Sequence, residues 1–335
     1  MGFILRKPSV EFKTDSHLPL ITDTTIERLV NRAVKGERRA ASRLMSLAEN
    51  DPEARLRILS VLYWRPGRAR VVGITGPPGC GKSTLIAQLA KSYREKNGTV
   101  GIVAVDPSSQ ITGGALLGDR IRMSELSSDS KVFIRSMATR GYFGGVARAT
   151  QDVVRIFDAL QMDFVIVETA GAGQSDVDVK NLAHTTVVVT APGLGDEIQA
   201  LKAGIMEIGD IFVVNKADRE NADQTVRELQ SMIMMSAPTG WRPRVLKTNA
   251  LSGEGVPQLA EAIHLHTEYQ HRNVDDAGRV GREVVYAARR YFEDIALEKA
   301  TSTQWFNNLC EEVKDRRIDP YSAARKLLRR TLRIS

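Results

Sequence analysis

Residues 76–83 read Gly-Pro-Pro-Gly-Cys-Gly-Lys-Ser, which matches the phosphate-binding pattern G-x-x-x-x-G-K-[ST]. An apolar run at 71–74 precedes the motif and a helix-forming stretch at 85–96 follows it. In such a loop the backbone N–H groups turn toward the β-phosphate, Lys82 reaches the β- and γ-phosphates, and Ser83 offers a hydroxyl to Mg²⁺. The stretch therefore predicts a P-loop NTPase fold. The residues expected to contact the nucleotide phosphates are Gly76, Gly79, Cys80, Gly81, Lys82, Ser83 and Thr84.

A second motif indicates which base is bound. Asn215-Lys216-Ala217-Asp218 directly follows an apolar run at 211–214. The carboxylate of Asp218 can accept two hydrogen bonds from the ring N–H and the exocyclic amine of guanine, whereas adenine lacks these donors. We therefore expect the site to bind GTP and to reject ATP. Asn215 is expected to brace the loop, and the aliphatic stem of Lys216 to cover one face of the base.

The loop at 248–251, Thr-Asn-Ala-Leu, is the third part of the expected nucleotide site. Asn249 stands where serine is usual, but the backbone N–H of Ala250 is still expected to reach the base oxygen. Base specificity should therefore be kept. The residues expected around the base are Asn215, Lys216, Asp218, Asn249, Ala250 and Leu251.

Three acidic residues between these motifs are candidates for holding Mg²⁺, namely Asp106, Asp119 and Glu168. Because Mg²⁺ keeps several waters and takes few protein carboxylates, not all three can contact the ion. We expect Ser83 and either Asp106 or Asp119 to lie nearest the metal, with Glu168 acting through water. An ordinary helix N-cap remains the alternative for Asp119.

Gly171 is expected to bring its N–H to the γ-phosphate and to lose this contact on hydrolysis. Many small GTPases carry a water-orienting glutamine directly after this glycine, where the present chain has Ala172. Intrinsic hydrolysis should therefore be slow. Positive charge for the transition state can come from Arg120, Arg122 or Lys202, and the sequence does not choose among them. The candidate catalytic residues are Lys82, Asp119, Glu168, Gly171 and Lys202.

Longer stretches resemble the MeaB/ArgK family of GTPases. They read DPSS from Asp106, GGALLGDRIRM at 113–123, FIRSMATRGYFGGVAR at 133–148, VETAGAGQSD at 167–176, and PGLGDEIQALKAGIMEIGDIFVVNKAD at 192–218. The resemblance covers about residues 24–332. It implies an α/β SIMIBI-class GTPase with a mostly parallel sheet, an N-terminal helical extension and a C-terminal helical arm that forms a homodimer.

The resemblance also implies a function. Members of this family gate the transfer of adenosylcobalamin into methylmalonyl-CoA mutase and protect that enzyme from inactivation. The chain is thus expected to be a GTP-hydrolysing chaperone of such an acyl-CoA mutase, with the mutase and its cobalamin adenosyltransferase as partners. Residues matching the family's nucleotide and magnesium positions are Lys82, Ser83, Asp106, Asp119 and Glu168, and 193–202 matches an additional mobile loop.

Two other functions fit a nucleotide-binding core. One is a metallochaperone GTPase that inserts a metal, although the sequence shows no Cys/His cluster suited to a metal. The other is a transport-associated ATPase or kinase, which Asp218 argues against because it favours guanine.

Composition favours a cytoplasmic globular protein. The chain has no apolar run near the roughly 18 residues needed to span a bilayer, and residues 1–20 do not resemble a secretory signal. The cysteines, Cys80 and Cys310, form no metal-ligand pair, and Cys80 is expected to be a small filler. The net charge is +7, but aromatic residues make up only 6%. We therefore expect neither nucleic acid nor a membrane as a partner.

Apolar periodicity predicts the order of domains. We expect a poorly ordered start at 1–20, a helical extension at 21–66, a GTPase core at 67–272 and a helical dimerisation arm at 273–335. The extension should hold one helix over 24–47 and another over 52–62. Strand-like runs alternate with helical patterns in the core and favour a mostly parallel sheet; they lie at 71–75, 100–105, 131–135, 163–168, 185–191, 210–214 and 243–248. A symmetry mate should cover the apolar faces of the arm, unless the arm packs back onto its own chain.

Overall fold

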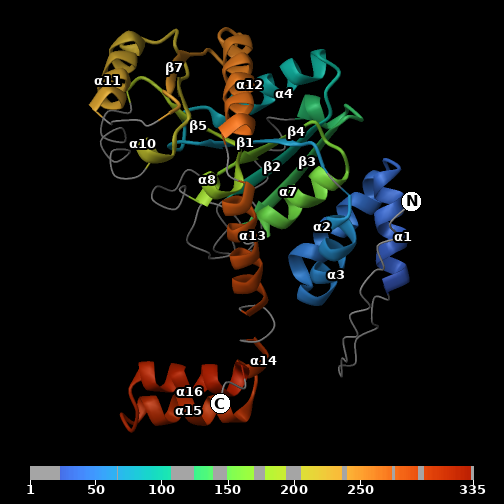
Figure 1. Cartoon of the computed structure of the whole chain (residues 1–335). Helices are drawn as coiled ribbons and strands as arrows, with labels where there is room; N and C mark the ends of the chain where they lie inside the picture. Colours follow the sequence, from blue (N-terminus) through green and yellow to red (C-terminus); the bar gives the residue numbers. More distant parts are fainter. Residues whose placement is uncertain are drawn as a thin grey trace.

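The computed structural model describes residues 23–65, 67–106, 124–138, 149–169, 178–193, 205–235, 240–273, 276–292 and 298–332. A seven-stranded sheet in the order β3-β2-β4-β1-β5-β6-β7 forms its centre (Figure 1). Every pairing between these strands is parallel. The predicted α/β fold is confirmed. The strands are β1 (Arg70–Thr75), β2 (Val100–Asp106), β3 (Val132–Ala138), β4 (Phe164–Glu168), β5 (Thr185–Thr190), β6 (Ile211–Val214) and β7 (Arg244–Lys247).

Helices cover both faces of the sheet, as a buried parallel sheet requires. Successive strand residues point to opposite faces, so Val72 packs with one group of helices and Val71 with another. Val72 shares its apolar cluster with α4 (Lys82–Glu95) and α12 (Val256–Asn273), whereas Val71 shares its cluster with α7 (Thr150–Ala159). The core helices are α4 (Lys82–Glu95), α6 (Ser124–Ser127), α7 (Thr150–Ala159), α8 (Asp178–Leu182), α10 (Ile205–Ile208), α11 (Ala222–Met235) and α12 (Val256–Asn273).

In the described residues 23–65, three helices precede the first strand. They are α1 (Asp23–Val34), α2 (Arg38–Asn50) and α3 (Pro52–Tyr63). The single helix predicted over 24–47 is wrong, because the chain breaks at Gly36, whose φ is 91°. A left-handed residue of this kind ends a helix, and glycine adopts it without a Cβ penalty. Both helices turn apolar residues toward one cluster, so the periodicity runs across the break.

These first helices pack directly on the core. Leu44 of α2 and Ile58 of α3 are fully buried in the cluster that contains Phe157 of α7. Arg135 of β3 pairs with Glu49 of α2, with Nη2 and Oε2 2.5 Å apart. The helices 23–63 therefore share one hydrophobic core with the sheet.

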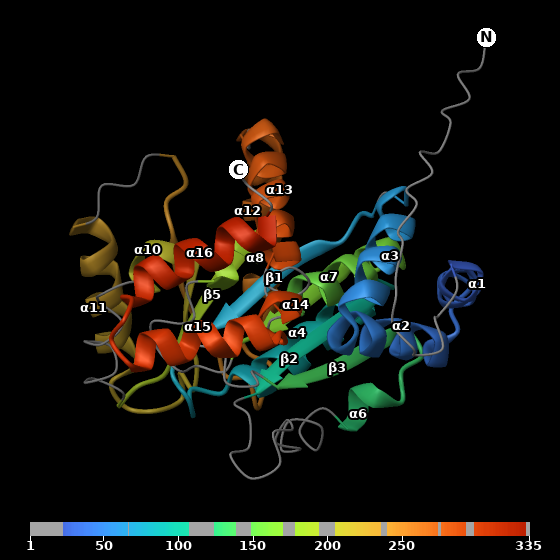
Figure 2. The ribbon, with the colours of Figure 1, turned by 90° about the horizontal axis from the view of Figure 1, so that it is seen from below.

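The last helices have a different setting. They are α13 (Asp276–Tyr291), α14 (Glu298–Thr301), α15 (Gln304–Lys314) and α16 (Pro320–Leu332). In Figures 1 and 2, α15 and α16 lie side by side, and Figure 1 shows them apart from the sheet, beyond the end of α13. Val280, Val284 and Val285 of α13 are exposed by 51%, 63% and 62%. Within the described part of the chain, no helix is both long and apolar enough to cross a membrane.

Candidate active site

The loop between β1 and α4 has the backbone shape that its sequence predicts. Gly76, Gly79 and Gly81 have φ values of 139°, 78° and 96°. A Cβ at Gly76 would overlap the backbone carbonyl oxygen of Val189 in the neighbouring strand β5. Only glycine can therefore hold this turn against β5. The loop ends at Gly81, the residue before α4, so it leads directly into the N-terminus of that helix, where phosphates commonly bind.

Lys82 and Ser83 start α4 and are buried, with 8% and 6% of their surface exposed. The Lys82 ammonium donates to the carbonyl oxygens of Gly76 at 2.8 Å and Pro77 at 3.2 Å, so it lies across the loop. The Ser83 hydroxyl donates to Oε1 of Glu168 at 2.6 Å. An ammonium, a hydroxyl and a carboxylate are thus placed together at the carboxyl ends of β1 and β4. In α/β sheets, ligands bind at this edge.

The donor set around Ser83 suits Mg²⁺. A hydroxyl and a carboxylate are hard oxygen ligands, and Glu168, with 4% of its surface exposed, is shielded from solvent. Bound there with GTP, the ion would neutralise charge on the phosphates during hydrolysis. Asp106 ends β2, which lies beside β4. Whether Asp106 or Asp119 lies nearest the ion stays a prediction, because Asp119 lies outside the described residues.

Two further catalytic candidates also lie outside the described residues, namely Gly171 and Lys202. The segment that leads to Gly171 is nevertheless anchored where it leaves β4. The Thr169 hydroxyl donates to the hydroxyl of Thr75 at 3.0 Å, and its N–H donates to the carbonyl oxygen of Ile74 at 3.1 Å. Sequence reasoning missed this anchor, since it depends on β1 and β4 being neighbours.

Asn215 joins three loops of the site. It is almost fully buried, and its Nδ2 donates to the carbonyl oxygen of Cys80 at 2.9 Å. Its Oδ1 accepts from the hydroxyl of Thr248 and the N–H of Ala250, both at 3.1 Å. This geometry fits the bracing role expected of Asn215. The contribution of Thr248 was not expected.

Lys216 makes a second link to the phosphate loop. Its backbone is left-handed, with a φ of 56°, and its ammonium donates to the carbonyl oxygen of Gly79 at 2.7 Å. The aliphatic stem therefore extends from the base-reading loop toward the phosphate loop. Asp218, two residues later, has an exposed side chain. This placement leaves its carboxylate open to a base.

The third loop is shaped by Asn249. Its Oδ1 accepts from the N–H groups of Leu251 at 3.0 Å and Ser252 at 3.4 Å, which forms an Asx turn. The side chain thus does what a serine hydroxyl does in a similar turn. Because the N–H of Ala250 donates to Asn215, it would have to change partners to reach a base oxygen. That contact stays a prediction.

Cys80 is fully buried within the phosphate loop. Burial raises the pKa of its thiol to about 11, so the group stays neutral at ordinary pH. A neutral buried thiol is a small packing side chain, which agrees with the predicted role. Thr84, in the first turn of α4, is only half-buried.

The geometry is that of a P-loop nucleotide site, and comparison with known proteins gives its family. A family model described as methylmalonyl Co-A mutase-associated GTPase MeaB matches residues 41–305. The chain belongs to the MeaB family.

The relatives of this MeaB-family chain agree. A protein of Pyrococcus abyssi named as a GTPase is 45% identical over 318 residues, which cover 91% of this chain and 96% of that protein. The mouse methylmalonic aciduria type A homolog, a mitochondrial protein, is 34% identical over 74% of this chain and 63% of its own length. The GTPase ArgK of Escherichia coli is 32% identical over 73% of this chain and 76% of its length.

A solved structure shares the fold. The crystal structure titled LAO/AO transport system kinase superposes with a TM-score of 0.68 and 24% identity, over 92% of this chain and 98% of that one. The predicted family and activity are confirmed, and this MeaB-family chain is a GTPase that binds guanine nucleotide. Lys82, Ser83 and Glu168 lie at the phosphate loop, and their contacts with phosphate and metal stay predictions.

Proposed function

We propose that this GTPase is a chaperone of an adenosylcobalamin-dependent acyl-CoA mutase, with methylmalonyl-CoA mutase as the first candidate. It would use GTP hydrolysis to gate cofactor loading and to protect the mutase. The observation that carries this proposal is the family match over residues 41–305, because the family description itself names association with that mutase. The name of the mouse relative, which refers to methylmalonic aciduria, points the same way.

The site supports a nucleotide-dependent switch. Glu168 bonds Ser83 and directly precedes Thr169, which is anchored to β1. A change at the γ-phosphate would therefore act on the chain that begins just after Thr169. In this proposal Gly171 contacts the γ-phosphate, Lys202 supplies positive charge, and Asp119 helps to hold Mg²⁺. A homodimer through the C-terminal helices and contact with the cobalamin adenosyltransferase belong to the same proposal.

GTP turnover with and without the mutase tests this function. The purified protein is assayed alone and with methylmalonyl-CoA mutase from the same source, with ATP as the nucleotide control. We expect slow turnover of GTP only, rising many-fold with the mutase. If the rate does not respond to the mutase, the partner proposal is wrong while the GTPase assignment stands.

Two variants of the site test nucleotide binding and base recognition separately. Lys82→Ala should abolish nucleotide binding, because the loop loses the charge that faces the phosphates. Asp218→Ala should weaken GTP binding at least about a hundredfold while leaving ATP binding as poor as before, since two charge-assisted hydrogen bonds to guanine are lost. Equal losses for Asp218→Ala with both nucleotides would contradict its base-reading role.

A hydrolysis-blocked variant separates a working switch from a passive scaffold. Glu168→Gln keeps the shape of the side chain but removes the charge that faces Ser83. We expect it to bind GTP, to hydrolyse it slowly and to fail in protecting the mutase through repeated cycles. Full protection without turnover would show that hydrolysis is incidental.

A further inference from the structure

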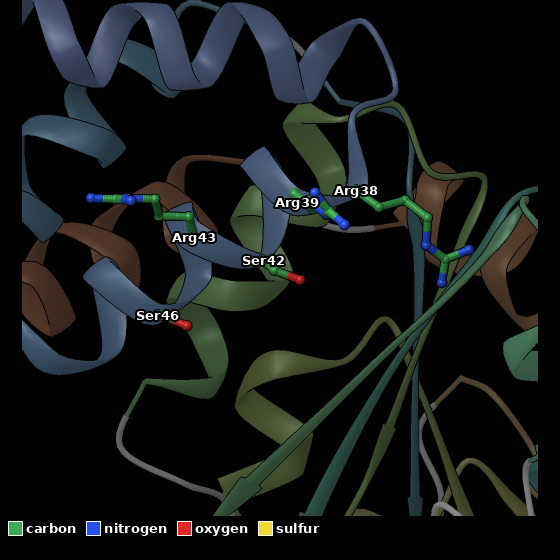
Figure 3. Close-up of a pocket in the computed structure, with 5 residues that line it drawn as sticks. All are labelled: Arg38, Arg39, Ser42, Arg43 and Ser46. Atoms are coloured by element: carbon green, nitrogen blue, oxygen red, sulfur yellow. The ribbon is translucent and has the colours of Figure 1, made fainter.

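The start of α2 carries a basic patch that the nucleotide site does not use. Arg38, Arg39, Ser42, Arg43 and Ser46 line a shallow hollow of about 470 Å³ (Figure 3). Figure 3 shows them all on one helix, with the arginine side chains spread along its surface. Arg39 and Arg43 are exposed and four residues apart, so they lie on the same side of the helix.

The carboxylates next to this patch are bound by other arginines. Glu37 is bonded by Arg32, and this bond is the main reason that its pKa is held below its ordinary value. Arg39 lowers that pKa only as a nearby charge. Glu49 is bonded by Arg135 at 2.5 Å. No ion pair joins Arg39 or Arg43 to a carboxylate among the residues that the structure describes.

Arg38 differs from the other two arginines. Its Nη1 donates to the carbonyl oxygen of Asp129 at 3.0 Å, and its guanidinium lies 5.3 Å from the ring centre of Phe133. It therefore helps to attach α2 to the sheet. The charges left for an outside ligand are those of Arg39 and Arg43, with the Ser42 hydroxyl between them.

The position of Arg39, in the first turn of α2, is unfavourable for the helix itself. The N-cap residue Glu37 makes no side-chain cap bond, and the first turn of α2 contains no acidic residue. Positive side chains there oppose the positive end of the helix dipole. An incoming anion would gain from the guanidiniums of Arg39 and Arg43 and, next to Arg39, from the helix dipole as well.

We infer that Arg39, Ser42 and Arg43 form a docking patch for an acidic surface of a partner protein. This inference rests on the proposed function, under which the partner is the acyl-CoA mutase. Guanidiniums recognise carboxylates with paired hydrogen bonds, so two arginines on one helix face can fix both position and orientation.

The size of the patch favours a protein over a nucleic acid. From Arg38 to Ser46 the helix rises roughly 12 Å, at about 1.5 Å per residue. Salt-dependent nucleic-acid binding usually involves about 6–10 phosphate contacts, which two free guanidiniums do not provide. A pair of acidic side chains on a folded partner matches the patch better.

Charge reversal tests this docking patch. The variant Arg39→Glu with Arg43→Glu is compared with the wild-type protein and with a matched control, Lys96→Glu with Arg227→Glu, at exposed positions just after α4 and on α11. Affinity for methylmalonyl-CoA mutase from the same source is measured with a non-hydrolysable GTP analogue, at low and at physiological salt. We expect the patch variant to bind at least about tenfold more weakly and with less dependence on salt, and the control to bind within about twofold of wild type.

Stability gives a second, independent readout. A glutamate at position 39, in the first turn of α2, suits the helix dipole, and position 43 is exposed. The midpoint of thermal unfolding should therefore not fall, and GTP turnover without the mutase should stay unchanged. If the midpoint does fall, the variant Arg39→Gln with Arg43→Gln is used instead of the charge reversal. The docking patch then predicts a smaller loss of affinity for the mutase in this variant.

The outcomes separate the two proposals. If wild type and patch variant bind the mutase equally, the docking patch is wrong and the proposed function stands. If the wild type does not bind the mutase, the proposed function fails and the patch assignment falls with it. Equal losses in the patch variant and the control, or binding of a short DNA duplex that only the patch variant loses, would also overturn the inference.

Discussion

The N-terminal and C-terminal helices are both added to the same sheet, and they differ in what covers their apolar faces. Leu44 and Ile58, in the N-terminal helices, are fully buried in one cluster with α7 and the sheet. Val280 and Val284, in α13, are more than half exposed, and α15 and α16 lie apart from the sheet (Figure 1).

The difference teaches that amphipathic helices at the two ends of one chain can have opposite roles. The first helices are part of the folding unit, because removing their apolar side chains from the core would expose the sheet. The last helices keep an apolar stripe that the described part of the chain does not cover. A second copy of the chain is our proposal for what covers it.

The largest expected effect comes from breaking a buried ion pair between α3 and α7. Arg55 and Asp152 are 3.9 Å apart, with side chains only 5% and 4% exposed. Asp152→Ala leaves the Arg55 charge buried, so we expect the free energy of unfolding to fall by about 3–5 kcal/mol. Urea denaturation followed by circular dichroism measures this loss.

A double replacement and an arm variant sharpen the result. Arg55→Met combined with Asp152→Leu should recover most of the loss, because apolar groups fill the space without a buried charge. Glu312→Gln, which removes the exposed pair with Lys326 in the arm, should change stability by at most about 1 kcal/mol. If Asp152→Ala and Glu312→Gln lower the free energy of unfolding by similar amounts, the N-terminal and C-terminal helices do not differ in the way described above.

The next effect comes from a cavity in the first helices. Leu44→Ala removes a fully buried side chain and should cost about 2–5 kcal/mol of unfolding free energy. The matched change in the arm is Leu328→Ala, at a side chain that is 42% exposed. We expect it to cost clearly less in the same denaturation experiment. A larger loss for Leu328→Ala would show that the arm is built into the folding unit.

A charge among the exposed valines of α13, Val280 and Val284, tests whether a second copy of the chain covers them. Val284→Asp should weaken self-association at least about tenfold, roughly 1.4 kcal/mol, because a carboxylate would be buried between two copies. Sedimentation velocity over a concentration series measures it. Arg289→Asp is the control, at an exposed position on the side of α13 opposite Val280. If Val284→Asp leaves the mass unchanged, the stripe does not join two copies.

The smallest effect should come from pH, at the last core helix before the arm. His266 of α12 is fully buried, and burial lowers its pKa from the ordinary 6.5, although the nearby Asp210 charge partly offsets this. The unfolded chain therefore takes up a proton first as the pH falls, and stability declines below about pH 6.5. His266→Gln should flatten this decline between about pH 7.5 and about pH 5.5 in urea unfolding. An unchanged pH dependence would show that other groups set it.

Most of the fold could be predicted from the sequence, for a physical reason. Buried parallel strands are short continuous apolar runs, and the seven observed strands lie where such runs were expected. The strand predicted at 131–135 ends three residues before β3 does. The reason is that Ser136, Met137 and Ala138 lack the β-branched side chains typical of a strand. The break at Gly36 was missed because apolar spacing does not register a change in helix direction.

The part of the site that is expected to bind phosphate through its backbone could be predicted from the sequence. A phosphate loop needs glycines at fixed spacing, so its residues are visible in the chain itself. The contacts of Thr169 with Thr75, and of Thr248 with Asn215, depend instead on which strands are neighbours. Strand order in the sheet differs from chain order, and no local pattern encodes it.

The two bonds from Asn215 and Lys216 to the phosphate loop have a consequence for nucleotide release. They join the carbonyl oxygens of Cys80 and Gly79 to side chains about 135 positions later in the chain. The phosphate loop and the loop at 215–218 are therefore directly connected. An outward movement of the loop at 215–218 would therefore also pull on the phosphate loop. We therefore expect a displacement of residues 215–218 to affect how the proposed site releases GDP.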